Sequence, residues 1–460
     1  MIGRAAGERQ GGPAVPAATR LGPVDELTCC YDSAAEPANV HIEVWLPGRL
    51  DLDAFGASVL AVLAARPRAR ARRRAASRWL ASSYWEYPPV LDADPVQVTA
   101  AADEAEIARW RAGFLSAAPS LDSAPPVRFL LVRGPDGDRV MLNAHHAVLD
   151  GLSCLELLRA VAAGYGGQSG PGPGDAPHGS AWLEDGPALA GAAPRPGGLI
   201  RRPVGLIRRP AGLVPRPAVR IAGRLDAGQH RNLPGYGACL ISWDGLAAVA
   251  RQLRAMGGSV NDLLIAAMIA TIGGWNSSNG GRAGRVRITM PVGDRAMTRV
   301  HGMLGHTSRL ATVTARPAAG MSCLELIGTV SQQTSWAKEH RGPQLDPASR
   351  LLAAAPLPVP VRRCLLRAGL RTAGSWLCDT SLVSNLGVIG PLRFGQAVAG
   401  AAWFSTSAHM PRGLSLGAVT VGGRLHLTFR YRHALFGEAA AAEFAGRYRD
   451  ALNDFAGAQL

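Results

Sequence analysis

The sequence contains no apolar run of the length that a membrane-spanning helix needs. Such a helix takes about 18 or more consecutive apolar residues, and the longest candidate, LLIAAMIATIGGW at 263–275, is interrupted by two adjacent glycines. We interpret it as a buried helix and expect no transmembrane segment. The N-terminal stretch MIGRAAGERQGGPAVPAATR also lacks the hydrophobic region of a secretory signal peptide. We therefore expect residues 1–19 to be a flexible leader and the protein to be cytoplasmic.

Lysine and paired cysteines are scarce as well. Lys338 is the only lysine, so the net charge of +15 comes almost entirely from arginine. This bias, together with abundant alanine and glycine, is typical of a GC-rich coding sequence. Because no nucleic-acid recognition motif accompanies the charge, we expect no nucleic-acid partner. The 7 cysteines form neither a CxxC pair nor a metal-ligand spacing, and their odd number argues against a disulfide framework. A reducing compartment and no bound metal are expected.

Arginine gathers in two places. The run RPRARARRR at 66–74 follows an amphipathic helix. We interpret it as a solvated helix end and loop, although it could face an acidic partner or a phosphorylated cofactor. The near-repeats GLIRRPV, GLIRRPA and GLVPRPA carry a proline every seventh residue, which excludes a continuous helix. We interpret 186–222 as an interdomain linker packed along the domain seam. Its paired arginines are an alternative site for a carboxylate or phosphate: Arg201, Arg202, Arg208 and Arg209.

The first half of the chain alternates strands and helices. Alternate positions of NVHIEVWL at 39–46 are apolar, which predicts a half-buried strand. Asp51 is expected to cap the helix that follows, whose apolar face includes Leu60. VRFLLVR at 127–133 and RVMLNAHH at 139–146 are predicted to pair as a hairpin, because PDGD between them contains an Asp-Gly turn signal.

The second half repeats this pattern. Asn261 is expected to cap the apolar helix DLLIAAMIATI, and strands are predicted for RVRITMPV and SRLATVTA. A long helix CLELIGTVSQQTSWAKEH, a hairpin of LSLGAVTV and RLHLTFRY, and a last helix from Gly437 follow. A chain of 460 residues is too long for one ordinary core. We predict an α/β (α+β) fold of two lobes, 20–185 and 223–460, arranged as a pseudo-dimer with the active site between them.

The segment NAHHAVLDG at 143–151 lies where the second hairpin strand ends and the helix LSCLELLRAVAAGY begins. If helical spacing continues after His146, Asp150 lies one turn further on, and Gly151 allows a close approach that other residues resist. A histidine held there through one ring nitrogen can accept a proton from a hydroxyl or amine as it attacks a carbonyl. Taken alone, the pair is better explained as two hydrogen-bonded core histidines. A metal site at His146 and Asp150 would need a third ligand, for which the spacing gives no candidate.

HHAVLDG fits the HHxxxDG signature of the chloramphenicol-acetyltransferase-like superfamily, which includes nonribosomal-peptide condensation domains, polyketide-associated acyltransferases and wax-ester synthases. The segments LPGRLDLDAFGASVLAVLAARPRARARR, VNDLLIAAMIATI, ITMPVGDR and SNLGVIGP also resemble family segments and follow in the same order. The resemblance implies a monomer with donor and acceptor channels that meet in a tunnel at the lobe interface. The DFGWG motif of plant BAHD acyltransferases is absent, since STSAHMPRG stands in that region, and this argues against that branch.

The resemblance also implies a role for each motif residue. His146 is expected to be the general base, His145 to be structural, and Gly151 to keep the passage beside His146 clear. Asp150 is expected to point away from the cleft in an ion pair with Arg295 of MPVGDR, which shapes the site.

One further position departs from the family pattern. In LGHTSRL, His306 stands where many relatives have asparagine, and this leaves the role of the position open.

The resemblance implies a freestanding condensation-type acyltransferase of specialised metabolism, such as nonribosomal peptide or antibiotic biosynthesis. Its acyl donor would sit on the phosphopantetheine of an acyl or peptidyl carrier protein or on coenzyme A, with no permanently bound cofactor. The acceptor would be a small-molecule amine or alcohol, and the basic run at 66–74 would meet the carrier protein or the phosphates of coenzyme A.

Two alternatives remain at this point. One is a lipid O-acyltransferase of the wax-ester synthase type, which predicts a lipophilic tunnel and membrane association. The other is a non-catalytic module of the same fold that binds a carrier protein. The intact His146, Asp150 and Gly151 argue against the non-catalytic module.

Overall fold

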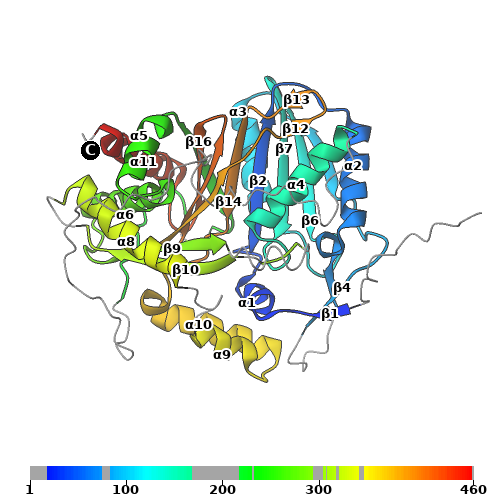
Figure 1. Cartoon of the computed structure of the whole chain (residues 1–460). Coiled ribbons are helices and arrows are strands. Elements are labelled where there is room, and N and C mark those ends of the chain that lie inside the picture. Colours follow the sequence, from blue (N-terminus) through cyan, green and yellow to red (C-terminus); the bar gives the residue numbers. More distant parts are fainter. Residues whose placement is uncertain are drawn as a thin grey trace, which may run out of the picture.

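The computed structural model shows two lobes side by side, each built around a β-sheet (Figure 1). Its described residues are 18–74, 83–167, 217–230, 233–293, 304–306, 308–317, 321–340 and 347–457. Most of the predicted leader and most of the predicted linker lie outside these ranges, as do Arg201, Arg202, Arg208, Arg209 and Arg295. The last two residues assigned to the leader, 18 and 19, belong to strand β1 (Ala18–Arg20), which corrects that boundary. The predicted two-lobed α/β architecture is confirmed.

The first lobe contains a five-stranded sheet with helices on both faces. Its strands, in spatial order, are β14 (Ala401–Thr406), β2 (Asn39–Leu46), β7 (Gly137–His145), β6 (Val127–Gly134) and β5 (Val96–Ala100). Helices α2 (Leu52–Ala65) and α4 (Gly151–Tyr165) pack together on one face, and α3 (Glu104–Leu115) packs on the other. The predicted hairpin is confirmed as β6 and β7, and Asp51 caps α2 through a hydrogen bond from the Ala54 N–H.

Burial corrects two of the predictions for this lobe. β2 is buried on both faces and not on one, because α3 covers the side that carries His41 and Glu43. The Glu43 carboxylate there pairs with the Arg111 guanidinium of α3 at 2.6 Å. Burial alone would raise the pKa of Glu43, but the arginine outweighs it and the pKa is lowered. Leu60, predicted on the apolar face of α2, is 49% exposed.

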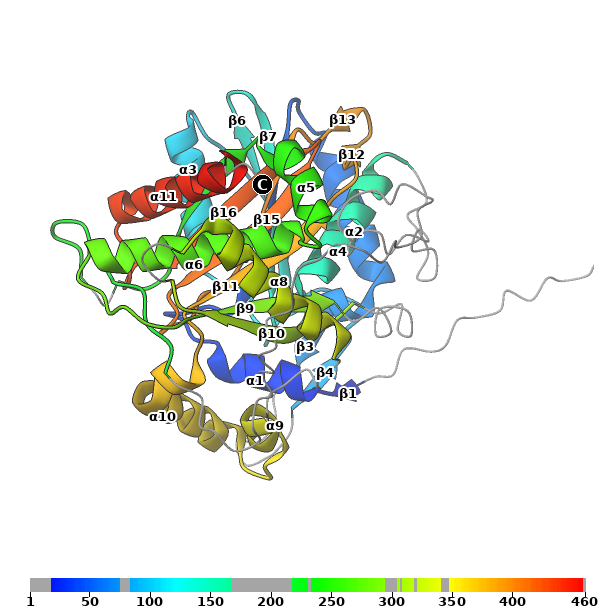
Figure 2. The same ribbon diagram turned by 60° about the vertical axis from the view of Figure 1, so that its left-hand side comes forward.

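The second lobe contains a six-stranded sheet covered by α5 (Leu246–Ala255), α6 (Val260–Ser278), α8 (Cys323–Glu339) and α11 (Glu438–Gly457). Figure 2 shows these helices in front of the sheet. The strands, in spatial order, are β10 (Ser308–Ala315), β9 (Val286–Gly293), β11 (Ser381–Val388), β15 (Leu414–Val421), β16 (Arg424–Arg432) and β8 (Tyr236–Trp243). The strands, the long helix, the hairpin and the last helix predicted for this half are confirmed.

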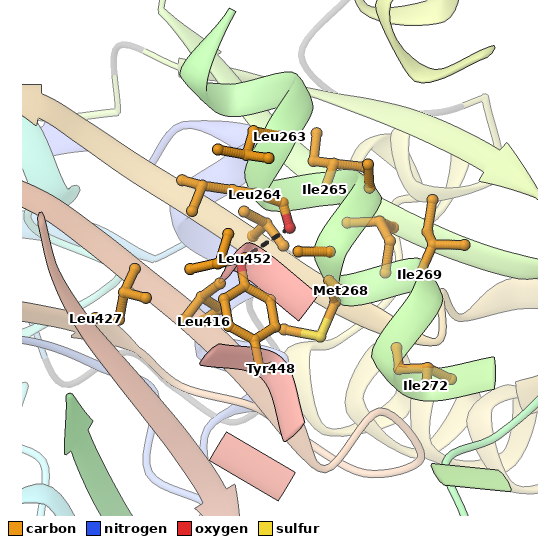
Figure 3. Close-up of a cluster of buried hydrophobic side chains, with 14 of the residues drawn as sticks. Leu263, Leu264, Ile265, Met268, Ile269, Ile272, Leu416, Leu427, Tyr448 and Leu452 are labelled. Carbon is orange, nitrogen blue, oxygen red and sulfur yellow. Dashed lines mark hydrogen bonds between the residues drawn. The ribbon is translucent and has the colours of Figure 1, made fainter. Parts of the chain in front are cut away.

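Helix α6 fills the core of the second lobe, as its continuous apolar sequence predicts. Its side chains pack between the sheet and α11, where the Tyr448 hydroxyl donates to the Leu264 carbonyl oxygen at 3.0 Å (Figure 3). The predicted cap is wrong. Ser259 is the N-cap residue and forms a capping box with Asp262, so Asn261 already lies inside the helix.

Among the described residues, no single helix combines the length and the apolar composition needed to cross a bilayer. Helices α5 and α6 meet that test only when taken together, and they are bent by 105° at their junction.

Smaller elements lie beside the two sheets. They are β1 (Ala18–Arg20), α1 (Pro23–Tyr31), a 3₁₀ turn (Pro67–Arg70), β3 (Arg72–Arg73), β4 (Tyr84–Glu86), β12 (Arg393–Phe394), β13 (Ala397–Val398), α9 (Pro347–Ala354) and α10 (Val359–Leu377). Helix α1 contacts both α9 and α10, and Glu26 of α1 forms a buried ion pair with Arg362 of α10. This contact connects a segment near the N-terminus to the second half of the chain.

The lobe boundary in space differs from the predicted boundary in sequence. Strand β14 belongs to the second half of the chain but pairs with β2 in the sheet of the first lobe. It also contacts β15 of the second sheet, where the Ser415 hydroxyl donates to the Thr406 carbonyl oxygen at 2.7 Å. The two strands are so close that a Cβ on Gly417 would lie 1.8 Å from the Phe404 carbonyl oxygen. The assignment of all residues 223–460 to one lobe is therefore wrong.

Candidate active site

The HHAVLDG segment forms a tight corner between β7 and α4. His145 ends β7, and the backbone N–H of His146 donates to the Ala38 carbonyl oxygen at 2.8 Å. The chain then turns, with the Val148 N–H donating to the His145 carbonyl oxygen at 2.9 Å, and α4 begins at Gly151. The corner is thus fixed by the backbone on both sides of the predicted catalytic histidine.

His146 shares one ring nitrogen with a backbone carbonyl, and among the described residues no hydrogen bond is made by the other. Its Nδ1 lies 3.2 Å from the Leu149 carbonyl oxygen. A carbonyl oxygen only accepts hydrogen bonds, so Nδ1 carries the proton in the neutral ring and Nε2 carries the lone pair. Burial, followed by the neighbouring His306, lowers the pKa of His146 to about 4. The imidazole is therefore neutral near pH 7 and able to accept a proton, although its side chain keeps some exposed surface.

His145 is held by a backbone hydrogen bond at one ring nitrogen and lies close to a carboxylate at the other. Its Nδ1 accepts from the Ala147 N–H at 3.1 Å, which places the proton of the neutral ring on Nε2, 3.5 Å from a carboxylate oxygen of Asp32. Burial alone would raise the pKa of Asp32, but the hydrogen bond and charge interaction with His145 contribute to a lowered value. These contacts suit the structural role that the resemblance implies for His145.

Asp150 caps α4. Its Oδ1 accepts from the Ser153 N–H at 2.9 Å, and the residue is buried. A carboxylate at this position satisfies one of the free N–H groups of the first helical turn and interacts favourably with the helix dipole. Arg295, its predicted ion-pair partner, lies outside the described residues, and so that ion pair stays a prediction.

Gly151 packs closely against the neighbouring side chains. A Cβ added to Gly151 would lie 2.8 Å from two ring carbons of Phe404 and 3.2 Å from Cδ2 of Leu386. Both side chains are buried. The missing Cβ therefore allows close packing at the lobe junction, and the expected clearance for substrate stays a prediction.

The second lobe adds a histidine to this corner. The ring of His306 lies with its centroid 5.3 Å from that of His146. The adjacent Gly305 is joined to Ser153 of α4 by two hydrogen bonds, Ser153 Oγ to the Gly305 carbonyl oxygen at 2.9 Å and Gly305 N–H to Ser153 Oγ at 3.1 Å. The sequence marked His306 only as a departure from relatives. Its spacing from His146 in the chain gave no signal that the two rings meet.

Arg68 of the basic run is part of the corner, which corrects the interpretation of this run as a solvated loop. Its guanidinium donates to the Ala147 and Val148 carbonyl oxygens at 3.1 and 3.2 Å and to Asp25 Oδ2 at 2.7 Å. It also lies 4.8 Å from the ring centroid of Trp85.

Three more arginines of the run also have acidic neighbours. Arg72 pairs with Glu86 and Asp92, Arg73 pairs with Asp122, and Arg74 lies 3.6 Å from Glu86. Much of the charge of the run is therefore neutralised within the protein.

The corner offers no activated nucleophile among its described neighbours. Burial raises the pKa of the Cys154 thiol far above its ordinary value, so the thiolate is disfavoured. The Ser153 hydroxyl is already bonded to Gly305. Within the described ranges, no group of three or more His, Cys, Asp or Glu residues could hold a metal ion. The chemistry available from the described corner is proton transfer by His146 to and from a reacting molecule.

Comparison with known proteins places the fold. No family model matches the chain. The chain is 29% identical over 441 residues to Rv2305 and to MT2362, two proteins described as uncharacterized from strains of Mycobacterium tuberculosis. The alignment covers 94% of this chain and 98% of each relative.

Solved structures match over almost the whole chain. The first condensation domain of the calcium-dependent antibiotic synthetase has a TM-score of 0.64 at 16% identity, covering 96% of this chain and 97% of that one. A wax ester synthase/diacylglycerol acyltransferase from Marinobacter aquaeolei VT8 has a TM-score of 0.59 at 16% identity, covering 95% and 98%. The starter condensation domain of rhizomide synthetase has a TM-score of 0.61 at 13% identity, covering 96% and 94%.

The chain therefore has the two-lobed fold of condensation-type acyltransferases, and the resemblance stated from HHAVLDG is confirmed for the fold. The relatives from Mycobacterium tuberculosis carry no described activity, and similarity at this level of identity does not transfer one.

Proposed function

We propose that the protein is an acyltransferase that moves an acyl group from a thioester to an amine or hydroxyl acceptor, with His146 as the general base. The observation that carries the proposal is the hydrogen bond from His146 Nδ1 to the Leu149 carbonyl, which leaves the Nε2 lone pair free at the lobe junction. The fold is shared with condensation domains and a wax ester synthase, which supports the reaction class.

In the proposed reaction the acceptor attacks the thioester carbonyl carbon, and a tetrahedral adduct forms as the carbonyl π electrons move to oxygen. The acceptor proton passes to Nε2 of His146. When the adduct collapses, the carbon–sulfur bond breaks, the thiol leaves with the proton returned by His146, and an amide or ester remains. Once the acceptor nitrogen or oxygen is bonded to the carbonyl carbon, its proton is more acidic than in the free amine or alcohol. A base with a low pKa such as His146 can therefore take it.

We propose coenzyme A or a carrier-protein phosphopantetheine as the source of the thioester, with no permanently bound cofactor. The phosphates of this donor are not assigned to the run at 66–74, because Arg68, Arg72 and Arg73 already pair with carboxylates. Pairing within the protein leaves less free charge for a second anion.

The test is to incubate the protein with acyl-coenzyme A, acyl carrier protein and acyl N-acetylcysteamine thioesters and with amine and alcohol acceptors. Mass spectrometry then detects the product and the released thiol. The rhizomide domain was crystallised with C8-CoA and Leu-SNAC, so these two compounds are a suitable starting pair. An ester product identifies an O-acyltransferase of the wax-ester type, and an amide product a condensation reaction. A thioester that binds without being consumed identifies a binding module and contradicts the proposal.

His146→Ala is expected to lower turnover by about 10²- to 10⁴-fold while the protein remains folded, since this is the span for loss of a general base. The matched control is His340→Ala on the exposed end of α8, which is expected to retain full activity. A folded His146→Ala protein with unchanged turnover would remove His146 from its proposed role.

A further inference from the structure

We propose that His306 and Asp25 form a positioning pair for His146, which completes the active site across the lobe junction. The inference rests on the proposed function, because it assigns the pair to the same reaction. Asp25 lies on α1 in the first part of the chain, and His306 lies between β9 and β10 of the second lobe. Neither was expected from the sequence to join the site.

The contacts form a closed circuit around the corner. His306 packs its ring against that of His146, and its Nε2 lies 3.7 Å from Asp25 Oδ1. The second carboxylate oxygen of Asp25 accepts from Arg68 at 2.7 Å and from Trp85 Nε1 at 2.9 Å. Arg68 also donates hydrogen bonds to the carbonyl oxygens of Ala147 and Val148, the two residues directly after His146. Asp25 therefore connects the ring that touches His146 to the arginine that holds its backbone.

This circuit is buried enough to restrict motion. The side chains of His306 and Asp25 are 11% and 10% exposed, and that of Arg68 is 13% exposed. The hydrogen bonds that the Asp25 carboxylate accepts from Arg68 and Trp85 are stronger than bonds between neutral groups, and their burial strengthens them further. The two hydrogen bonds between Gly305 and Ser153 attach the His306 segment to the same helix that Asp150 caps. His306 is therefore held from two sides before it meets His146.

The role is positioning and not proton transfer to substrate. Nε2 of His306 lies 3.7 Å from Asp25 Oδ1, close to the carboxylate but beyond hydrogen-bond distance, whereas the Leu149 contact of His146 uses Nδ1 and not the Nε2 lone pair. The charged and titratable groups that act on the His146 ring are His306, Asp150 and His145. Those that act on His306 within the described ranges include Asp25, Asp150 and Arg68. Burial is the main cause of the lowered pKa of His146, and the second imidazole beside it adds to that lowering, so His306 both orients the ring and further disfavours its protonation.

The first experiment needs no substrate. The C–H resonances of ¹³C-histidine-labelled full-length protein are titrated with pH, and His146 is identified as the signal lost in His146→Gln. His306→Asn is expected to move the His146 titration upward, from about 4 toward its ordinary 6.5, because one lowering influence is removed. His306→Gln is the second variant in case the first does not fold. His340→Asn, on the exposed end of α8, is the matched control and should leave the titration unchanged.

The second experiment measures kcat and KM with octanoyl-coenzyme A and the acceptor found in the assay above. His306→Asn and Asp25→Asn are each expected to lower kcat by about 10- to 100-fold with KM within about twofold, since misplacement of a catalytic group by about 1 Å costs rates of this order. The double variant should lose less than the product of the two single losses, because both changes break one circuit.

The two experiments separate the failure of this inference from the failure of the proposed function. If wild-type protein transfers no acyl group, the NMR titration still decides whether His306 acts on His146. An unchanged His146 titration in folded His306→Asn or His306→Gln overturns the inference. A wild-type kcat in His306→Asn overturns it as well, even if the titration moves.

Discussion

Replacing Gly151 with alanine adds a methyl group where the folded protein has no room for one. The new Cβ would lie 2.8 Å from two ring atoms of Phe404. The ring cannot move aside freely, because Phe404 is 2% exposed and its carbonyl oxygen lies against Gly417 of the neighbouring sheet. The strain must therefore be absorbed by the corner that carries His146 or by the contact between the lobes.

The size of the effect follows from this geometry. Overpacking a well-filled core costs about 1–3 kcal/mol. Alanine at a helical position offsets up to about 1 kcal/mol through its better backbone propensity, so we expect Gly151→Ala to lower the free energy of unfolding by about 1–2 kcal/mol. Phe404→Leu should relieve the clash, and the double variant should show a favourable coupling of about 1 kcal/mol.

The assay is urea unfolding followed by tryptophan fluorescence, with kcat measured on the same samples. Gly56→Ala on α2 is the matched control, because a Cβ there meets nothing within 4 Å and alanine should raise stability by about 0.5–1 kcal/mol. A Gly151→Ala protein with wild-type stability and no turnover would refute the packing role and restore the substrate passage expected from the sequence. Wild-type stability together with wild-type turnover would show that the Phe404 contact is not tight.

Two more predictions concern buried ionisable groups. Asp150→Asn keeps a side-chain oxygen for the Ser153 N–H and so retains the helix cap. If Asp150 is ion-paired as the sequence predicts, urea unfolding should still show that the free energy of unfolding falls by about 3–5 kcal/mol. A fall of less than about 1 kcal/mol would argue against that ion pair. Burial lowers the pKa of His41 to about 3 from 6.5, so the unfolded chain binds a proton that the folded protein rejects, and stability should fall as the pH drops from 6.5 toward 3. In His41→Gln the free energy of unfolding should fall less steeply with decreasing pH, by about 1.4 kcal/mol per pH unit. The measurement is urea unfolding at a series of pH values. Parallel curves for the two proteins would exclude His41 as a cause of the pH dependence.

The local patterns of the sequence predicted most elements of both lobes. Alternation located β2, the Asp-Gly turn located the hairpin of β6 and β7, and the continuous apolar run located α6. These signals are short-range, because each depends on residues only a few positions apart. The cap of α6 was misplaced at Asn261, since Ser259 and Asn261 are both good capping residues and only the backbone distinguishes them.

Long-range pairing could not be predicted in the same way. β14 lies in the chain between β11 and β15 of the second sheet but pairs with β2 in the first sheet. Its sequence does not show this, because an apolar strand fits either sheet. The alternation in β2 likewise predicts one solvent-exposed face, because the sequence does not show that α3 packs there. In the structure α3 covers that face, and its buried Arg111 pairs with Glu43. The pairing of the basic run could not be predicted either, because its acidic partners, such as Asp25 and Asp122, lie on other segments of the chain.

The candidate site was predicted in its centre and missed at its edge. HHAVLDG located the corner, since the motif occupies one continuous stretch of the chain. Asp25 and His306 are far from that stretch in sequence; Asp25 has an ordinary sequence context, and His306 is marked there only by its departure from the family pattern. They meet only because α1 and the second lobe pack against the same corner.

The path of β14 has a consequence for how the protein unfolds. Because this strand closes the edge of the first sheet and contributes Phe404 to that core, the first part of the chain cannot form its complete core without the last part. A chain cut between α4 and β8 would leave β2 with an unpaired edge, which favours aggregation. The two lobes are therefore expected to melt in a single calorimetric transition despite their separate sheets, and two co-expressed halves would have to assemble with each other to become stable.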